Sequence, residues 1–155
     1  MFAESNCYSM RKLVIFSMYA IPLGLITYTG LTHLKLNGST TADDVMELIR
    51  RQRHLVSLRV DCLNLADTQT DFSIPECTEH EPMTPLDTQI KYLALLCTEQ
   101  DELPGLALSM LKYLLLRIPT LTSVTTAIVS REQILAFIDE YIQWYPHLAS
   151  IERAM

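Results

Sequence analysis

Glycine is scarce in this chain, which has only four in 155 residues. None of them lies in a run suited to cradling a phosphate, and the sequence contains no G-x-G-x-x-G, Walker, G-x-S-x-G or H-E-x-x-H motif. Acidic pairs such as Asp43-Asp44 and Asp139-Glu140 fall at expected helix starts or exposed helix faces, where solvated carboxylates are common. We therefore predict no catalytic residues, no cofactor and no enzyme activity.

Cysteine pairs at metal-ligand spacing are also missing. The four cysteines include no C-x-x-C pair: they are Cys7, Cys62, Cys77 and Cys97. Scattered thiols of this kind are typical of a reducing compartment, so we expect no metal site and a cytoplasmic or nuclear location. His54 and His147 each precede a predicted strand at the same place in a repeated phrase, which indicates a structural role for both.

A basic excess is absent as well, since 18 acidic residues outnumber 12 basic ones and the net charge is −6. Such a chain lacks the basic surface that nucleic-acid binding normally needs. The acidic excess is local: between Cys62 and Gln89 lie six acids, three prolines and no Lys or Arg. We predict that residues 63–88 form an irregular, solvated acidic loop in place of a helix.

What the chain does contain is a repeated phrase, apolar-x-x-apolar-x-apolar, which is the strand signature of leucine-rich repeats. The phrase lies at residues 30–36, 54–60, 89–95, 120–124 and 147–151, and also at Met10, Leu13 and Ile15. We predict an α/β fold, namely a short right-handed leucine-rich repeat solenoid with strand–helix repeats and a parallel sheet. It would span residues 10–155 with about six strands, after a disordered segment or cap at residues 1–9.

Helix-forming segments separate the predicted strands. Residues 40–53 begin with capping hydroxyls and first-turn acids and end with three arginines. Residues 104–118 are apolar on nearly all sides and are bounded by prolines. A third helix begins at Ser130, which forms a capping box with Gln133, and it ends before Pro146.

The apolar run at residues 13–26 has a second interpretation. Because Arg11 and Lys12 precede it, the run resembles the charged and hydrophobic regions of a signal peptide. It is short for a membrane span, Pro22 and Gly24 interrupt it, and no A-x-A-like cleavage site follows. We favour a first repeat strand here and keep a signal or membrane anchor as the alternative.

Residues between the apolar positions of each phrase should point away from the core, because strand side chains alternate between the two faces of a sheet. Stacked strands then place equivalent residues in columns about 4.8 Å apart. The first column would be Lys12, His33, Ser57, Tyr92, Ser123 and Ser150, and the second Val14, Lys35, Arg59, Ala94, Thr125 and Glu152. From these we predict a partner-binding face of Lys12, His33, Lys35, Ser57, Arg59, Tyr92, Ser123 and Thr125.

Residues 31–37 (LTHLKLN), 55–61 (LVSLRVD) and 113–121 (YLLLRIPTL) resemble the leucine-rich repeat region of F-box-type proteins, especially fungal ones. The resemblance covers residues 10–152. It implies a horseshoe of strands and helices that selects substrates for a cullin-type ubiquitin ligase. Because only nine residues precede the first predicted strand, we expect this sequence to lack the F-box itself, the helical segment that docks the ligase adaptor. The resemblance assigns no catalytic residue.

Together these features predict a protein–protein interaction scaffold, with a substrate-recognition repeat module of a ubiquitin-ligase receptor as its narrower form. The expected partner is a protein, with no nucleic acid and no membrane. The alternatives are a small membrane-anchored or secreted protein that uses residues 13–26, and a truncated repeat fragment without function. An uncapped repeat end would favour homo-oligomers. We also expect the acidic loop at 63–88 to fold over the basic columns and block them.

Overall fold

The computed structural model describes residues 11–20, 26, 30–74, 82–96, 104–127 and 129–155. One five-stranded sheet has the order β1-β2-β3-β4-β5 with all neighbours parallel. Its strands are β1 (Lys12–Ala20), β2 (His33–Thr41), β3 (Ser57–Asn64), β4 (Tyr92–Leu95) and β5 (Ser123–Thr126). The helices of the described residues are α2 (Ala42–Arg51), α3 (Pro104–Arg117), α4 (Arg131–Tyr141) and α5 (Leu148–Ala154). The predicted α/β class and parallel sheet are confirmed.

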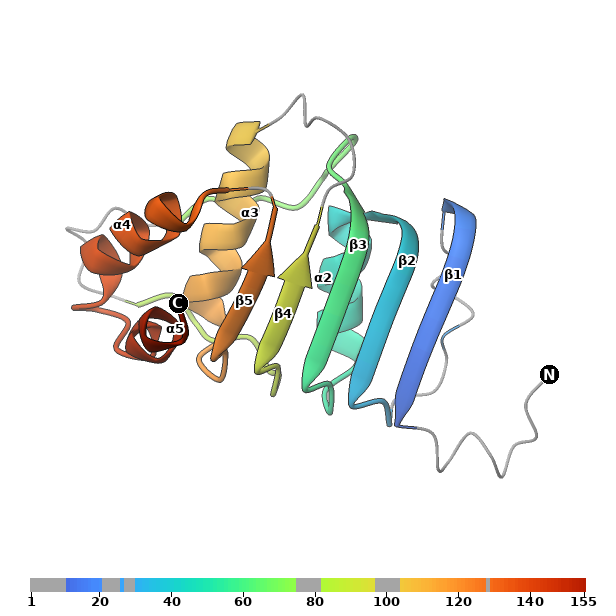
Figure 1. The fold of residues 1–155 in the computed structure, drawn as a ribbon, viewed down its shortest axis with the longest axis horizontal. Helices are drawn as coiled ribbons and strands as arrows, with labels where there is room; N and C mark the ends of the chain where they lie inside the picture. The colour runs from blue at the N-terminus through green and yellow to red at the C-terminus, as the bar shows by residue number, and fades with distance from the viewer. Residues whose placement is uncertain (1–10, 21–25, 27–29, 75–81, 97–103, 128) are drawn as a thin grey trace.

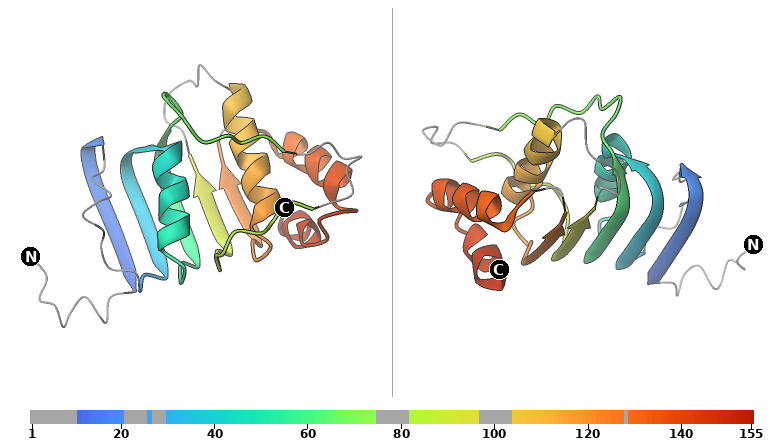
Figure 2. Two further views of the ribbon diagram at one scale, coloured as in Figure 1. Left: turned by 180° about the vertical axis from the view of Figure 1, so that it is seen from behind. Right: turned by 45° about the horizontal axis from the view of Figure 1, so that its top comes forward.

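The helices are placed unevenly around the sheet. Helices α2 and α3 lie on one face, while α4 and α5 lie beyond β5 at the end of the sheet (Figure 1). Views from behind and from above show no described helix on the opposite face (Figure 2). We call this uncovered surface, formed by the outward side chains of β1 to β5, the open face.

Each strand after β1 begins with the same hydrogen-bond arrangement. One backbone carbonyl accepts bonds from two consecutive N–H groups at the start of the next strand, with N···O distances of 2.7–3.1 Å. The four carbonyls belong to Arg11, Thr32, Val56 and Lys91, and the donors are the N–H groups of residues 32 and 33, 56 and 57, 91 and 92, and 122 and 123. Equivalent positions of the repeated phrase therefore occupy equivalent places along the sheet, consistent with strand–helix repeats.

The phrase also accounts for the core. Its nine apolar residues in the three central copies are each at most 2% exposed: Leu31, Leu34, Leu36, Leu55, Leu58, Val60, Ile90, Leu93 and Leu95. Helix α2 adds Val45, Leu48 and Ile49 from one face. Burial of each such side chain contributes about 1.5–3 kcal/mol relative to exposure. The predicted Ser130–Gln133 capping box at the start of α4 is present.

The sixth predicted strand is wrong, because Leu148–Ala154 form helix α5. The turn that leads into it does match the earlier copies. The N–H of Leu148 donates to the carbonyl of Tyr145 at 3.0 Å, as that of Leu121 does to Ile118 at 3.2 Å. After this turn the chain leaves the strand path, so Ser150 and Glu152 do not extend the two outward columns.

Local composition explains why the two copies diverge after the shared turn. Strand β5 is Ser-Val-Thr-Thr, and its three β-branched residues favour extended backbone. Helix α5 reads Leu-Ala-Ser-Ile-Glu-Arg-Ala, in which alanine, glutamate and arginine favour a helix. Leu148 and Ile151, three residues apart, then lie on one helical face, and both are fully buried. Helix α5 contacts β5 and α4 and so covers part of this sheet edge.

The acidic segment differs from its prediction in two ways. Strand β3 continues to Asn64, and Leu65 and Phe72 are buried instead of solvated; the described parts of the segment after β3 are 65–74 and 82–88. Both parts pack on the helix side of the sheet (Figure 2). The Phe72 ring meets the Tyr113 ring of α3 edge-on at 5.3 Å between centroids. The predicted cover over the open face is therefore wrong for these residues, and residues 75–81 lie outside the described ones.

Residues 12–20, which carry the start of the ambiguous apolar run, form strand β1. Residues 1–10, 21–25 and 27–29 lie outside the described residues, and with them the predicted N-terminal cap and most of the rest of that run. Within the described ranges, no helix combines the length and apolar character that crossing a membrane requires.

Candidate partner-binding face

The eight residues predicted for partner binding all lie on the open face. The sheet register pairs Lys12 with His33, His33 with Ser57, Ser57 with Tyr92, and Tyr92 with Ser123. The second column pairs Val14 with Lys35, Lys35 with Arg59, Arg59 with Ala94, and Ala94 with Thr125. Both predicted columns are thus in register across five strands, without their sixth members.

The N-terminal half of the open face is basic, although the chain as a whole is acidic. Arg59 is paired within its own strand, since its Nε donates to Asp61 Oδ1 at 2.6 Å. Lys12 and Lys35 form no ion pair with any residue that the structure describes. The His33 ring is held by its neighbour, with Nδ1 2.9 Å from the hydroxyl of Thr32. The ammonium groups of Lys12 on β1 and Lys35 on β2 therefore lie on the open face without an ionic partner among the described residues.

An apolar row on β1 completes this half of the face. Val14, Phe16 and Met18 point outward and are 50%, 72% and 94% exposed. Val14 was placed in the second column from the sequence, whereas Phe16 and Met18 were missed. A signal was available, since residues 13–16 are four consecutive apolar residues, and such runs are typical of strands covered on both faces. The described residues cover only the inner one.

The C-terminal half of the face is polar and uncharged. Tyr92 is 51% exposed. Ser123 and Thr125 on β5 continue the two columns beyond it, and Thr125 is exposed. This half offers hydroxyl groups for hydrogen bonds and no charge.

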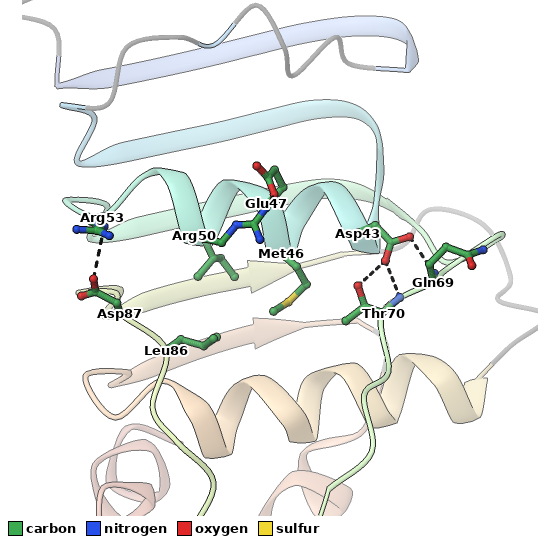
Figure 3. A pocket seen from close by; sticks show the side chains of 10 residues that line it. Asp43, Met46, Glu47, Arg50, Arg53, Gln69, Thr70, Leu86 and Asp87 are labelled. Atoms are coloured by element: carbon green, nitrogen blue, oxygen red, sulfur yellow. Dashed lines mark hydrogen bonds and ion pairs between the residues drawn. The ribbon is translucent and has the colours of Figure 1, made fainter.

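A hollow lies on the helix side of the sheet, between α2 and the described parts of the acidic segment (Figure 3). It measures about 650 Å³, and Met46, Ile49 and Leu86 supply its apolar lining. Its charged side chains already have partners. Arg50 pairs with Glu47, and Arg53 Nε lies 3.4 Å from Asp87 Oδ2.

Asp43 at the rim of this hollow ties the acidic segment to α2. Its carboxylate accepts hydrogen bonds from the Thr70 hydroxyl, from the Thr70 N–H at 2.8 Å and from the Gln69 N–H at 2.9 Å. The hydroxyl bond, followed by the Gln69 backbone bond, lowers the pKa of Asp43 below its ordinary value. The charged side chains that line the hollow thus all have a partner within the chain.

No three His, Cys, Asp or Glu side chains of the described residues lie close enough to hold a metal ion. His80, Cys7, Cys77 and Cys97 are outside that part of the chain. His147 has a structural contact, with Nε2 2.7 Å from the carbonyl oxygen of Leu115 at the end of α3.

Comparison of the chain with protein-family models, curated proteins and solved structures found no match. The resemblance to F-box-type repeat proteins accordingly rests on the residues quoted for it.

Proposed function

We propose that the chain is a protein-interaction scaffold of leucine-rich repeat type that binds a protein partner on its open face. The observation that carries the proposal is the face itself. Eight outward residues align in register across five strands, and no described helix covers them. Lys12 and Lys35 have no described ionic partner there, so an acidic partner would gain two ion pairs. Repeat arrays commonly bind through such surfaces.

The repeat interpretation draws on two recurring details. The same pair of hydrogen bonds opens β2, β3, β4 and β5. The same three-residue turn also precedes two of these strands, with the N–H of Leu55 bonded to Gln52 at 3.1 Å and that of Leu121 to Ile118 at 3.2 Å. Parallel strands joined by helices cross over with a right hand almost always, so a short right-handed solenoid is the proposed architecture.

The narrower proposal is a substrate-recognition module of a ubiquitin-ligase receptor. It is supported by the resemblance of residues 31–37, 55–61 and 113–121 to the repeats of F-box-type proteins. In that case the bound partner would be degraded, and its half-life would lengthen when this chain is removed from cells. An unchanged half-life would leave a scaffold without a role in turnover.

The test of the broader proposal is site-specific photocrosslinking in the full chain. A photoreactive phenylalanine derivative replaces Tyr92 on the open face or, as a matched control, Gln143, an exposed residue that follows α4. The proposal expects one protein to crosslink at position 92 and not at 143, and Lys35→Glu to reduce the yield. Equal crosslinking at both positions, or indifference to Lys35→Glu, would contradict it.

A further inference from the structure

We infer that the N-terminal half of the open face binds an extended segment of the partner that carries a large apolar residue and, two residues along, an acidic residue. This inference rests on the proposed function and specifies the chemistry of the partner. The residues that carry it are Val14, Phe16 and Met18 on β1, with Lys35 on β2 as the main charged contact.

The apolar residue of the partner segment is inferred from the outward side chains of β1. These side chains are the large apolar groups most exposed in the described structure, apart from Tyr92. Burying apolar surface stabilises a complex, and the exposed side chains of Phe16 and Met18 lack this stabilisation in the free chain. A bound apolar side chain would recover part of it and would make the outer surface of β1 resemble the doubly covered strand that its sequence indicates.

The acidic residue of the partner segment is inferred from the charge of Lys35. Lys35 is the register partner of Arg59, so two cations lie opposite each other on adjacent strands. Asp61 neutralises Arg59, and no described acid pairs with Lys35. A carboxylate placed between β2 and β3 would relieve this repulsion and meet the ammonium group of Lys35.

The spacing follows from strand dimensions. Side chains on one side of an extended segment are about 6.6 Å apart, and neighbouring strands are about 4.8 Å apart. A segment that crosses the strands with its apolar residue above β1 therefore places its next facing side chain between β2 and β3. Lys35 on β2 and Arg59 on β3 are register partners on either side of that position.

The size of the face favours a segment over a globular surface. Five strands are about 19 Å across, and the longer strands run about 27 Å, which gives an area of roughly 500 Å². A standard protein–protein interface needs about 800 Å² on each partner. About six extended residues would cross the whole sheet. A lipid surface fits less well, because the apolar row is confined to β1, while β3, β4 and β5 offer the hydroxyl groups of Ser57, Tyr92 and Ser123 on the same face.

The test uses the full chain and a fluorescein-labelled decapeptide with Leu-Ser-Glu at its centre and glycine and serine around it. Fluorescence anisotropy should show saturable binding that weakens as salt is raised, because exposed ion pairs are screened. Lys35→Glu should weaken binding about fivefold or more, and Phe16→Ser should weaken it by a similar factor. Arg131→Glu on α4 is the matched charge reversal and should change nothing.

A charge swap isolates the proposed contact. A Leu-Ser-Lys peptide should bind Lys35→Glu better than the wild type, and a Ser-Ser-Glu peptide should be insensitive to Phe16→Ser. Circular dichroism confirms that each variant folds. If the wild type does not bind the Leu-Ser-Glu peptide, or binds it no better than the Leu-Ser-Lys and Ser-Ser-Glu peptides, the inference is wrong.

Two further outcomes separate this inference from the proposed function. If a partner crosslinked at position 92 depends on Lys35 but binds independently of Phe16, the inference fails and the scaffold proposal stands. If the chain instead sediments with phosphatidylserine vesicles in a Lys35-dependent manner and ignores the peptides, the cluster is a lipid-binding surface and the inference is overturned.

Discussion

Lys35 on β2 and Arg59 on β3 are register partners whose side chains both point outward on the open face. Like charges directly opposite each other on adjacent strands are destabilising. Asp61 offsets the charge of Arg59 at 2.6 Å, while Lys35 has no described counter-ion. Residue pairs that oppose folding are expected where a surface serves binding, and Lys35 with Arg59 is such a pair.

Replacing Lys35 should therefore separate stability from binding. Lys35→Thr removes the repulsion and adds a β-branched residue, so we expect the free energy of unfolding in urea to rise by about 0.5 kcal/mol. Binding to the partner should weaken in the same variant. Lys12→Thr is the matched control. The register partner of Lys12 is a histidine and not an arginine, so this variant should raise stability less. A clear loss of stability in Lys35→Thr would show that Lys35 supports the fold.

Asp43 should anchor the acidic segment to α2. Asp43→Asn keeps the side-chain shape but weakens three hydrogen bonds, so we expect about 1 kcal/mol lower stability. Hydrogen exchange should accelerate at the N–H groups of Gln69 and Thr70. Asp44, the neighbouring acid in the same helical turn, accepts no hydrogen bond from described donors through its side chain. Asp44→Asn should therefore lower the stability less. Equal losses would point to the helix dipole as the cause.

The same carboxylate predicts a pH dependence. Since hydrogen bonds hold the pKa of Asp43 below its ordinary value of 3.8, the folded state binds the proton less readily than the unfolded chain does. This contribution is fully present above pH 3.8 and is lost as the pH falls through the lower folded value. The stability difference between wild type and Asp43→Asn, measured in urea, should therefore shrink at acidic pH. A difference that grows below pH 3.8 would contradict the assignment.

Much of the fold was predictable because the repeated phrase records burial directly. Its apolar positions gave both the strands and their register, and the outward columns followed from side-chain alternation. The failure at residues 148–154 has a local cause. Two apolar residues three positions apart suit a helix as well as a repeat strand, and only the intervening residues decide.

The sequence predicted which residues of the candidate site align in columns, but not the exposed apolar side chains beside them. Phe16 and Met18 were missed because exposure of an apolar side chain depends on what covers the sheet, which a single sequence does not reveal. The acidic segment was misplaced for a related reason. Its charge suggested attraction to the basic columns, whereas Phe72 and Leu65 decided its position by packing on the helix side.

Ile151 tests the helical end of the chain. Its side chain is fully buried in α5, so Ile151→Ala should cost about 2–5 kcal/mol of stability through lost contacts and a cavity. Ser150→Ala, the exposed neighbour, should change thermal stability little, since alanine favours a helix. If residues 148–154 formed a strand in solution, the helix preference of alanine would bring no benefit at position 150. Circular dichroism of Ser150→Ala would then show no increase in helix content.

Gly105 offers a stabilising substitution in the first turn of α3. A methyl group added there meets no atom within 4 Å, and the residue is exposed. Gly105→Ala should raise stability by about 0.5–1 kcal/mol, because alanine loses less backbone freedom on folding. Thermal unfolding would measure the change. A lower midpoint would mean that this turn is not helical in solution.

The most direct test of partner binding on the open face is the affinity of the crosslinked partner, once purified, for two charge-reversed proteins. One carries Lys12→Glu and Lys35→Glu on the open face, and the other carries Arg131→Glu and Arg153→Glu on α4 and α5. The account predicts that the first binds at least about tenfold more weakly than wild type and that the second binds like wild type. Equal affinity of both for the partner, or a loss confined to the second, would contradict it.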